Sequence, residues 1–558
     1  MAAVMMLLFT CVPLTLAQDS GPLVKGVVSD ENGEPIIGAV VNVPGTSRGT
    51  TTDIDGAYTI HASKGETLEF SFIGYDKQQI KVKESPSVVN VSLIPNAQMM
   101  MDEVVVIGYG TTTKTDLTGS VTNVKMSDIR DTPVLSVDQA LQGRIAGADI
   151  MSTTGEPGAN TSIRIRGTRS ISASNEPLIV VDGVMDAVHD LNDLNMADIQ
   201  SISVLKDASS TAIYGSRGSN GVIIVTTKQG SGSSGKPNIT LKADVGFSQL
   251  PKGLDIMNAA EFAQYRNDYA YFNTADGNDA VGEGTPLSKY PYPDPFSLGK
   301  GTDWVEEITR TAPTQNYVLS ISGSAAKTKY YGSFSYNDTR GIIENSGMKR
   351  LTGRISLEHE FAKWITVGYK GTYTHRNQDM NLAAIGGTAY YQAAIYLSPL
   401  IKANDNFNPL WNNGQKINTP RSTIDLNTYN MKRRSMNHAI TFDITILPNL
   451  KFRSQNSYYT YDRETFRYYP STLPRKVEGE GGEAYRADWK EHTLSSENTL
   501  TYFLKAKSGH NLDVMGGFTG YTYHSDSFTL EGKGYMDDNV KWNNMNAVPD
   551  KETYSATT

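Results

Sequence analysis

The sequence predicts a mainly β protein in three parts: an N-terminal β-sandwich, an α/β domain, and the first part of an antiparallel transmembrane β-barrel. Turn residues separate many short β-branched and aromatic runs, and the 558 residues include 50 glycines and 30 tyrosines, a composition suited to strands and tight turns. Beyond the N-terminal leader, no stretch approaches the roughly 20 apolar residues of a membrane-spanning helix. The second half instead alternates apolar and polar residues, which is typical of a barrel wall.

Residues 1–17 are predicted to be a signal peptide. An apolar run over residues 4–16 ends in Thr15, Leu16 and Ala17, a small-residue cleavage pattern. The only cysteine, Cys11, would leave with this peptide, so the mature chain would contain no disulfide. The net charge of −8 is dispersed, and the sequence lacks the clustered basic surface that nucleic-acid binding needs.

Residues 18–94 are predicted to form the β-sandwich. Turn residues interrupt the apolar runs at ENGEP (31–35), PG (44–45) and DIDG (53–56). Asp53 and Asp55 could suggest calcium, but the rest of a twelve-residue calcium loop is absent, so a hairpin turn is expected. The stretches GVVSDENGEPIIGAVVNVPGT and TTDIDGAYTI resemble the carboxypeptidase regulatory-like domain.

A linker at residues 95–114 contains the segment MDEVVVIGYG, with a β-branched run at its centre. An extended run outside a domain can add as a strand to the edge of a partner's sheet. The same residues could also be the first buried strand of the next domain. The residues alone leave both interpretations open.

Residues 115–230 carry the most specific motifs of the chain. They include ALQGRIAGADI, SIRIRGTRSI, EPLIVVDGV and DIQSISVLKDASSTAIYGSRGSNGVIIVTTKQG. In this order, they resemble the plug of a SusC/RagA-type TonB-dependent outer-membrane transporter. The resemblance implies an α/β plug, a periplasmic N-terminal domain, and a TonB box made of Asp102, Glu103, Val104, Val105, Val106, Ile107 and Gly108. It therefore favours strand addition to TonB over a buried strand in the linker.

Within the plug, three arginines are predicted to anchor it to the barrel. Arg164 and Arg166 lie on one face of an alternating strand, and Arg217 lies among glycines. In a partly desolvated lumen, guanidinium groups need carboxylate partners, and Glu358 and Glu497 are candidates on the wall. The alternative is a solvated edge strand. A phosphate-binding loop is disfavoured because no Lys-Ser/Thr pair follows the glycines.

Residues 231–558 are predicted to form barrel strands. Apolar residues alternate with polar ones along 351–358, 365–373 and 440–446, and short connections at 324–328 and 447–450 alternate with a long one at 377–429. Residues 258–269 read as a helix. About nine or ten strands are recognisable where a plugged barrel uses roughly 22, so a fragment is expected.

The resemblance implies import of an oligosaccharide or peptide, with TonB, a SusD-like lipoprotein and outer-membrane lipid as partners. Four aromatic residues of the long connection could contact such a ligand or pack the loop: Tyr390, Tyr391, Tyr396 and Trp411. Siderophore uptake is the alternative ligand class, and an adhesin or receptor without transport is the alternative function. None of the eight histidines lies in an HExxH motif, and no GxSxG or dinucleotide fingerprint occurs. We therefore expect no catalytic residue, metal or cofactor.

Overall fold

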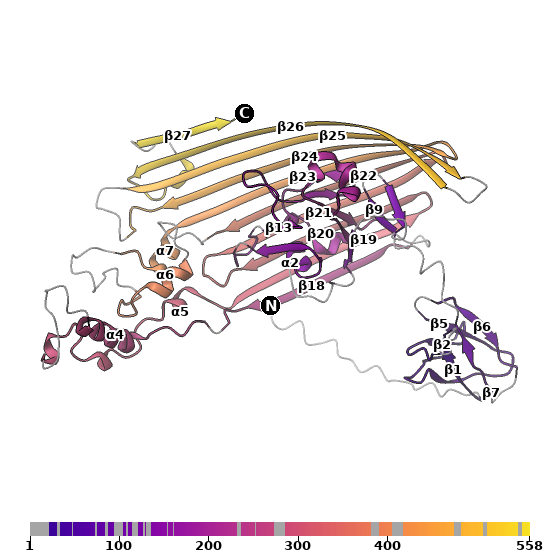
Figure 1. The fold of residues 1–558 in the computed structure, drawn as a ribbon, viewed down its shortest axis with the longest axis horizontal. Helices are drawn as coiled ribbons and strands as arrows, with labels where there is room; N and C mark the ends of the chain where they lie inside the picture. Colours follow the sequence, from indigo (N-terminus) through magenta and orange to yellow (C-terminus); the bar gives the residue numbers. More distant parts are fainter. Residues whose placement is uncertain are drawn as a thin grey trace, which may run out of the picture. The chain divides into compact units, whose positions relative to one another are not determined.

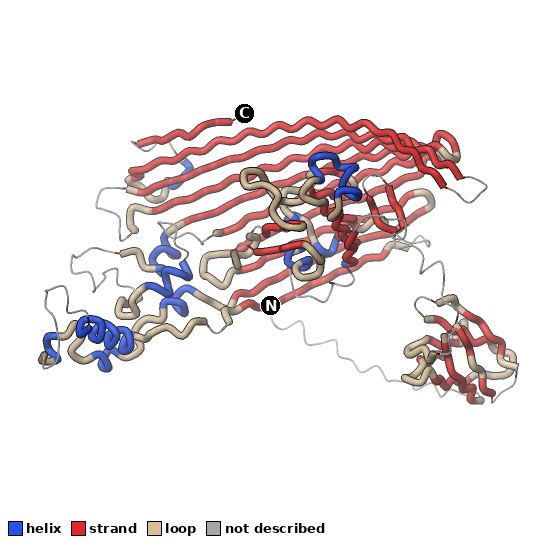
Figure 2. Tube along the Cα trace, in the orientation of Figure 1, coloured by secondary structure: helices blue, strands red, loops and turns tan. Residues whose placement is uncertain are grey.

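The computed structural model describes residues 22–557 except 31–33, 47, 73–74, 84–86, 94–103, 108–109, 114–120, 127–128, 130–135, 153, 160, 231–235, 252, 273–284, 381–389, 404–416, 474–480, 506–510 and 545–549. The predicted signal peptide lies outside the described residues. The chain forms two compact units, the first made of residues 1–105 and 111–117 and the second of residues 106–110 and 118–558. Figures 1 and 2 show the elements of each unit.

The first unit contains two four-stranded sheets around one core, as the sequence predicts. One sheet pairs β1 with β4, β7 and β8, and the other has the order β3-β2-β5-β6. The strands are β1 Leu23–Ser29, β2 Val40–Asn42, β3 Gly49–Thr51, β4 Ala57–His61, β5 Thr67–Ser71, β6 Gln78–Lys81, β7 Ser87–Val88 and β8 Val91–Ser92. Alternate residues of both sheets are buried, and Tyr58 meets Phe70 edge-on at 5.4 Å between ring centroids.

The turn before β4 is built by an aspartate. The Asp53 carboxylate accepts the backbone N–H groups of Asp55 and Ala57 at 3.0 and 2.9 Å. An aspartate that binds the backbone two residues ahead stabilises such a turn. DIDG is thus a turn, but the strands that it joins, β3 and β4, lie in different sheets, so it is not the hairpin turn that we expected. In the linker, β9 Val104–Ile107 and β10 Gly110–Thr113 form a two-stranded sheet.

The plug, residues 121–230, is a small α/β domain. Its five-stranded sheet has the order β11-β16-β17-β14-β15, and β12 and β13 form a separate hairpin. The elements are β11 Val121–Lys125, α2 Val137–Leu141, β12 Ala148–Ser152, β13 Thr161–Ile165, β14 Leu178–Val181, β15 Val184–Met185, the 3-10 helices η3 Leu191–Asp193 and η4 Met196–Asp198, β16 Ile199–Leu205, α3 Ala208–Thr211, η5 Ala212–Gly218 and β17 Val222–Thr227. The residues Val222 to Val225 are fully buried, as expected for that run.

The wall is a ten-stranded antiparallel sheet in which each strand pairs with its neighbours in the sequence. Its strands are β18 Asn238–Ser248, β19 Ala312–Ala325, β20 Thr328–Arg340, β21 Gly347–Ala362, β22 Ile365–Asp379, β23 Thr428–Leu447, β24 Leu450–Tyr469, β25 Gly482–Lys505, β26 Asn511–Tyr535 and β27 Asp550–Thr557. Tight turns join β19 to β20, β21 to β22 and β23 to β24. Long connections alternate with these turns, which confirms the predicted pattern.

The long connections carry short helices, gathered at one end of the wall in Figure 1. They are α4 Ala259–Phe272, η7 Leu287–Lys289, η8 Pro295–Leu298, α5 Trp304–Ile308, α6 Tyr390–Tyr396, α7 Pro420–Leu426 and η9 Lys541–Asn543. Helix α4 confirms the helix predicted at residues 258–269. None of the helices described is both long enough and apolar enough to cross a bilayer.

The two faces of the wall reverse the usual arrangement of a soluble protein. On β21, Ile355 and Leu357 are 51% and 44% exposed, whereas Thr352, Arg354 and Ser356 are buried. Large exposed apolar patches on soluble proteins are rare, and a barrel wall needs an apolar outer band to face lipid. The apolar face therefore suits the hydrocarbon of the outer membrane, and the polar face is covered by the plug.

Candidate functional site: the interface between plug and wall

A tight turn places one plug carboxylate directly against the wall. Asp182 and Gly183 form the two-residue loop between β14 and β15, with Val181 opposite Val184. Both loop residues have positive φ, 53° and 90°, and an Asp-Gly pair suits such a hairpin turn because both types tolerate this conformation. The turn thus places the Asp182 side chain between Thr227 of the plug and Arg354 of the wall.

Two wall cations and one plug threonine hold this carboxylate. Arg354 of β21 and Lys370 of β22 lie 3.0 and 3.3 Å from its oxygens. Thr227 donates its backbone N–H at 3.0 Å and its hydroxyl at 2.5 Å. Burial raises the pKa of Asp182, but Lys370, Arg354 and the Thr227 hydrogen bonds lower it more, so the net pKa lies well below its usual range. Asp182 is therefore a buried, charged anchor.

A second acidic group lies on the turn before β16. Asp190 caps η3 by accepting the backbone N–H of Asn192 at 2.9 Å, and Asp193 ends the same short helix. Asn195 caps η4 by accepting the N–H of Ala197 at 3.0 Å. Side-chain caps of this kind satisfy backbone donors that a helix start leaves free. The sequence HDLNDLNMAD thereby forms two consecutive short turns that present Asp190 and Asp193 to the wall.

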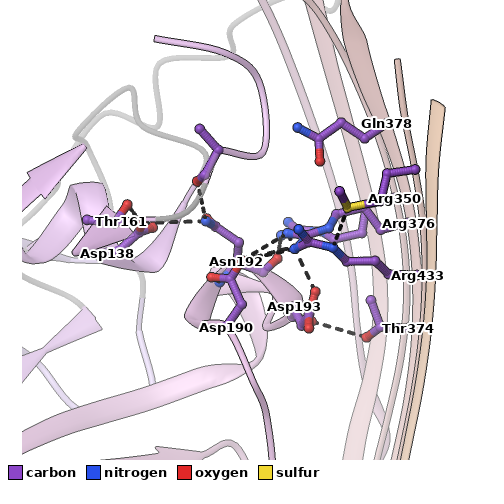
Figure 3. A network of polar contacts seen from close by, with 12 residues as sticks. Asp138, Thr161, Asp190, Asn192, Asp193, Arg350, Thr374, Arg376, Gln378 and Arg433 are labelled. Carbon is purple, nitrogen blue, oxygen red and sulfur yellow. Dashed lines mark hydrogen bonds and ion pairs between the residues drawn. The ribbon is translucent and has the colours of Figure 1, made fainter. Parts of the chain in front are cut away.

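Three arginines from three neighbouring wall strands meet this acidic turn (Figure 3). Both terminal nitrogens of Arg376 donate to Asp190 at 3.3 Å, and Arg376 lies 3.6 Å from Asp193. Arg433 reaches Asp190 at 3.5 Å, and Arg350 donates to the carbonyl of Asn192. Burial raises the pKa of Asp193 above its usual range, although Arg376 opposes this effect.

Further polar contacts surround these ion pairs. The Tyr331 hydroxyl donates to Asp198 at 2.8 Å, and the Thr374 hydroxyl donates to the carbonyl of Asp193 at 3.1 Å. Gln378 donates to the carbonyl of Pro157 at 2.8 Å. His189 of the plug also contacts Glu491 of β25. These bonds join the plug to wall strands β20, β22 and β25.

The interface leaves little free space. A cavity of about 30 Å³ lies between β14, β15 and the wall, which is room for about one water molecule. Its lining includes Val181, Val184, Leu194 and Tyr459. The described part of the plug therefore packs closely against the wall, and the carboxylates of Asp182, Asp190 and Asp193 are largely removed from bulk solvent.

The anchors are carboxylates on the plug and cations on the wall. This is the reverse of the arrangement that we expected, with plug arginines and wall carboxylates. Arg166 pairs with Asp207 of the plug itself at 2.8 Å, and Arg164 lies opposite Asp149 in the β12–β13 hairpin. The wall residue Glu358 pairs with Lys329 of the neighbouring wall strand at 2.7 Å. Arg166 and Glu358 thus each have a partner on their own side of the interface, in the plug and in the wall respectively.

Arg217 is the predicted anchor that does approach the wall. It pairs with Asp186 inside the plug, and its guanidinium lies 4.9 Å from the centre of the Tyr521 ring of β26. It also interacts electrostatically with Glu497, a buried residue of β25. A direct Arg217–Glu497 anchor stays a prediction.

Of the four predicted ligand contacts, one is buried in a core and another is exposed at the surface. Tyr390 is 2% exposed and packs with Trp304, Ile308 and Ile424 in a small core of the loop helices. It packs the loop, which is the alternative that the sequence left open, and its role as a ligand contact stays a prediction. Tyr391 is partly buried, and Tyr396 is 74% exposed. Trp411 lies outside the described residues.

The TonB box is described only in its centre. Val104, Val105, Val106 and Ile107 form β9, as the sequence predicts for an extended strand. Asp102, Glu103 and Gly108 lie outside the described residues. One edge of β9 is taken by β10.

Sequence reasoning missed the charges that cross the interface. Arg350, Arg354, Arg376 and Arg433 lie on the buried polar face of their strands. The alternation of these strands was a usable signal, because a charged residue on the polar face of a wall strand must point to the lumen. No such signal existed in the sequence for Asp182, because an aspartate before glycine in VVDG is already explained by the turn that the pair forms.

Comparisons with known proteins agree with this architecture. Residues 113–222 match the family model of the TonB-dependent receptor plug domain, and residues 24–106 match that of the CarboxypepD_reg-like domain. The TonB-dependent receptor P26 of Formosa agariphila is 34% identical over 527 residues, which are 94% of this chain and 51% of that protein. The TonB-dependent receptor SusC of Bacteroides thetaiotaomicron is 32% identical over 543 residues, 92% of this chain and 51% of that protein.

Solved structures show the same fold. The RagAB peptide importer in its closed-closed state matches with a TM-score of 0.66 and 25% identity, over 79% of this chain and 52% of that one. A further RagAB peptide transporter structure matches with a TM-score of 0.65 and 26% identity, over 78% and 51%. The chain spans about half the length of the curated relatives it matches. In both sequence and fold, this chain belongs with the outer-membrane TonB-dependent receptors of the SusC/RagA type.

Proposed function

We propose that this chain supplies the plug and adjoining wall of a transporter that imports a nutrient ligand across the outer membrane. TonB energises the import, and a SusD-like surface lipoprotein assists it. The observation that carries the proposal is the buried set of ion pairs between plug carboxylates and wall cations, centred on Asp182 and Asp190. A plug held in this way is a closed gate.

The energetics of these pairs favour a gate that needs work to open. Separating a buried ion pair leaves uncompensated charges and costs about 3–5 kcal/mol. The structure contains at least two such pairs in different strands, Asp182 with Arg354 and Asp190 with Arg376. Spontaneous release would therefore be rare. A partner that pulls on the plug from its N-terminal side would supply the work, and β9 is the strand on which we propose that it pulls.

Strand addition to TonB predicts that the backbone of β9 matters more than its side chains. Main-chain hydrogen bonds provide most of the affinity when a strand joins a sheet edge, and proline removes one donor. Val105→Pro or Val106→Pro should therefore abolish uptake, whereas Val105→Thr or Val106→Thr should preserve it. The measurement is uptake of the nutrient that supports growth only when this gene is present, with and without a proton-motive force.

The matched threonine variants control for loss of the β-branched side chain, and the amount of protein in the outer membrane controls for assembly. Normal energy-dependent uptake by both proline variants would overturn the proposal. Loss of uptake in the threonine variants as well would point to recognition of side chains instead.

For the ligand, we propose an oligosaccharide or a peptide. RagAB, whose structures match this chain, is described as a peptide importer. This similarity supports a peptide ligand. Tyr391 and Tyr396 of α6 stay proposed contacts, and the high exposure of Tyr396 leaves its ring free to stack on a ligand.

A further inference from the structure

Four arginines form a continuous row across the lumen face of the wall. Antiparallel register places Arg350 opposite Arg376, Arg376 opposite Arg433, and Arg433 opposite Arg463. Directly opposed residues of neighbouring strands have their Cβ atoms only about 5 Å apart. This arginine row (Arg350, Arg376, Arg433, Arg463) therefore runs across strands β21, β22, β23 and β24 at one level of the lumen.

Such a row is unfavourable without anions. Like charges directly opposite in a sheet repel each other, and burial of the first three arginines removes most of the water that would screen them. Arg463 gains its contact from the ring of Trp489, 4.5 Å from its guanidinium carbon. The two ion-paired carboxylates that face the row, Asp190 and Asp193, both belong to the plug.

The plug carboxylates satisfy the row only in part. The Nε atoms of Arg350 and Arg376 are buried and donate no hydrogen bond to any described residue. Neither oxygen of Asp193 accepts one from the described part of the chain, although Arg376 lies 3.6 Å away. Buried polar groups are normally paired, so the row has donor capacity beyond what the plug uses.

We propose that the arginine row is an oxyanion-binding station for the transported ligand, which the plug carboxylates occupy while the gate is closed. This inference rests on the proposed function, because ligand reaches the row only when the acidic turn leaves. A planar, five-donor guanidinium suits carboxylate, sulfate and phosphate groups. The ligand is therefore an acidic nutrient molecule that bears such groups, and Asp190 and Asp193 imitate them.

The test removes the plug's anions and asks whether added anions replace them. In the full chain in detergent, Asp190→Asn/Asp193→Asn leaves the arginine row without counter-charges. Sodium sulfate should then raise the unfolding midpoint temperature by about 2 °C or more relative to sodium chloride of equal ionic strength. Sodium acetate, tested in parallel, distinguishes a preference for planar carboxylates from one for tetrahedral oxyanions.

Two comparisons isolate the row. The wild-type protein, whose row is occupied, and a variant that also carries Arg376→Gln and Arg433→Gln should both show no anion-specific rise. Because sulfate stabilises many proteins by exclusion from their surface, only the difference between variants counts. If the double variant does not fold, Asp193→Asn alone, which loses no hydrogen bond seen here, takes its place.

An equal response of all variants to sulfate and acetate would overturn the proposal. The assay involves neither TonB nor transport, so its failure would leave the proposed import function standing. Conversely, normal energy-dependent uptake by both β9 proline variants would overturn the proposed import function, while the anion site could still exist.

Discussion

Arg376→Gln should release the plug, because this arginine joins both carboxylates of the acidic turn. Its side chain is fully buried, with Asp190 at 3.3 Å and Asp193 at 3.6 Å. Glutamine keeps a polar side chain of shorter reach but removes the charge. Two plug carboxylates would then face the wall with Arg433 and Arg350 as their remaining cations.

The magnitude follows from the loss of one partner of a buried pair, about 3–5 kcal/mol. Each 1.4 kcal/mol is a factor of about ten in an equilibrium constant, so the unseated fraction should rise by roughly two to three and a half powers of ten. The assay is sensitivity of the producing cells to an antibiotic too large to cross an intact outer membrane, at equal amounts of wall protein.

Arg434→Gln is the matched control. Arg434 follows Arg433 in the sequence but points to the other face, where it pairs with Glu464 at 2.7 Å on the surface. An exposed pair contributes about 0–1 kcal/mol, so this variant should stay sealed. Equal leakage by both variants, or none from Arg376→Gln, would refute the reasoning.

Three further predictions concern the plug and the loops. Asp182→Asn should raise leakage more than Asp193→Asn, because four groups hold Asp182 whereas Asp193 accepts no hydrogen bond from the described residues; a reversed order would argue against Asp182 as the main anchor. Since the pKa of Asp182 is lowered in the seated plug, its contribution is complete above the ordinary value near 3.9 and is lost only as pH falls further, so the difference in leakage between the wild type and Asp182→Asn should be the same at pH 7 and pH 5. Tyr390→Ala should cost about 3–5 kcal/mol of loop stability and expose the long connections to protease, whereas Tyr396→Ala should not.

Much of the wall was predictable from the sequence. Alternation of apolar and polar residues depends only on the two-residue period of a strand, so the faces of β21, β22 and β23 followed directly. The tight turn after β21 also sets the register that brings Arg350 opposite Arg376. Extending the register argument to the lumen-facing arginines would have revealed the arginine row.

The sequence did not allow us to predict which charged residue of the plug pairs with which charged residue of the wall. Arg166 and Asp207 lie 41 positions apart, while Asp182 and Arg354 lie 172 apart, so both pairs depend on how the plug folds and docks. The sequence also shows carboxylates and cations in both parts, without showing which face each other. Likewise, the burial of Tyr390 depends on packing among α5, α6 and α7, which no local pattern encodes.

The coupling between Arg376 and Asp193 tests most directly whether wall cations hold the plug carboxylates. Plug retention is measured in the Arg376→Gln and Asp193→Asn variants and in the variant that combines them, as antibiotic entry at equal protein abundance. If the two residues attract each other across the interface, the combined variant should leak less than the product of the two single effects, since each neutralisation removes the other's uncompensated charge. Single effects that multiply without any coupling would contradict the account.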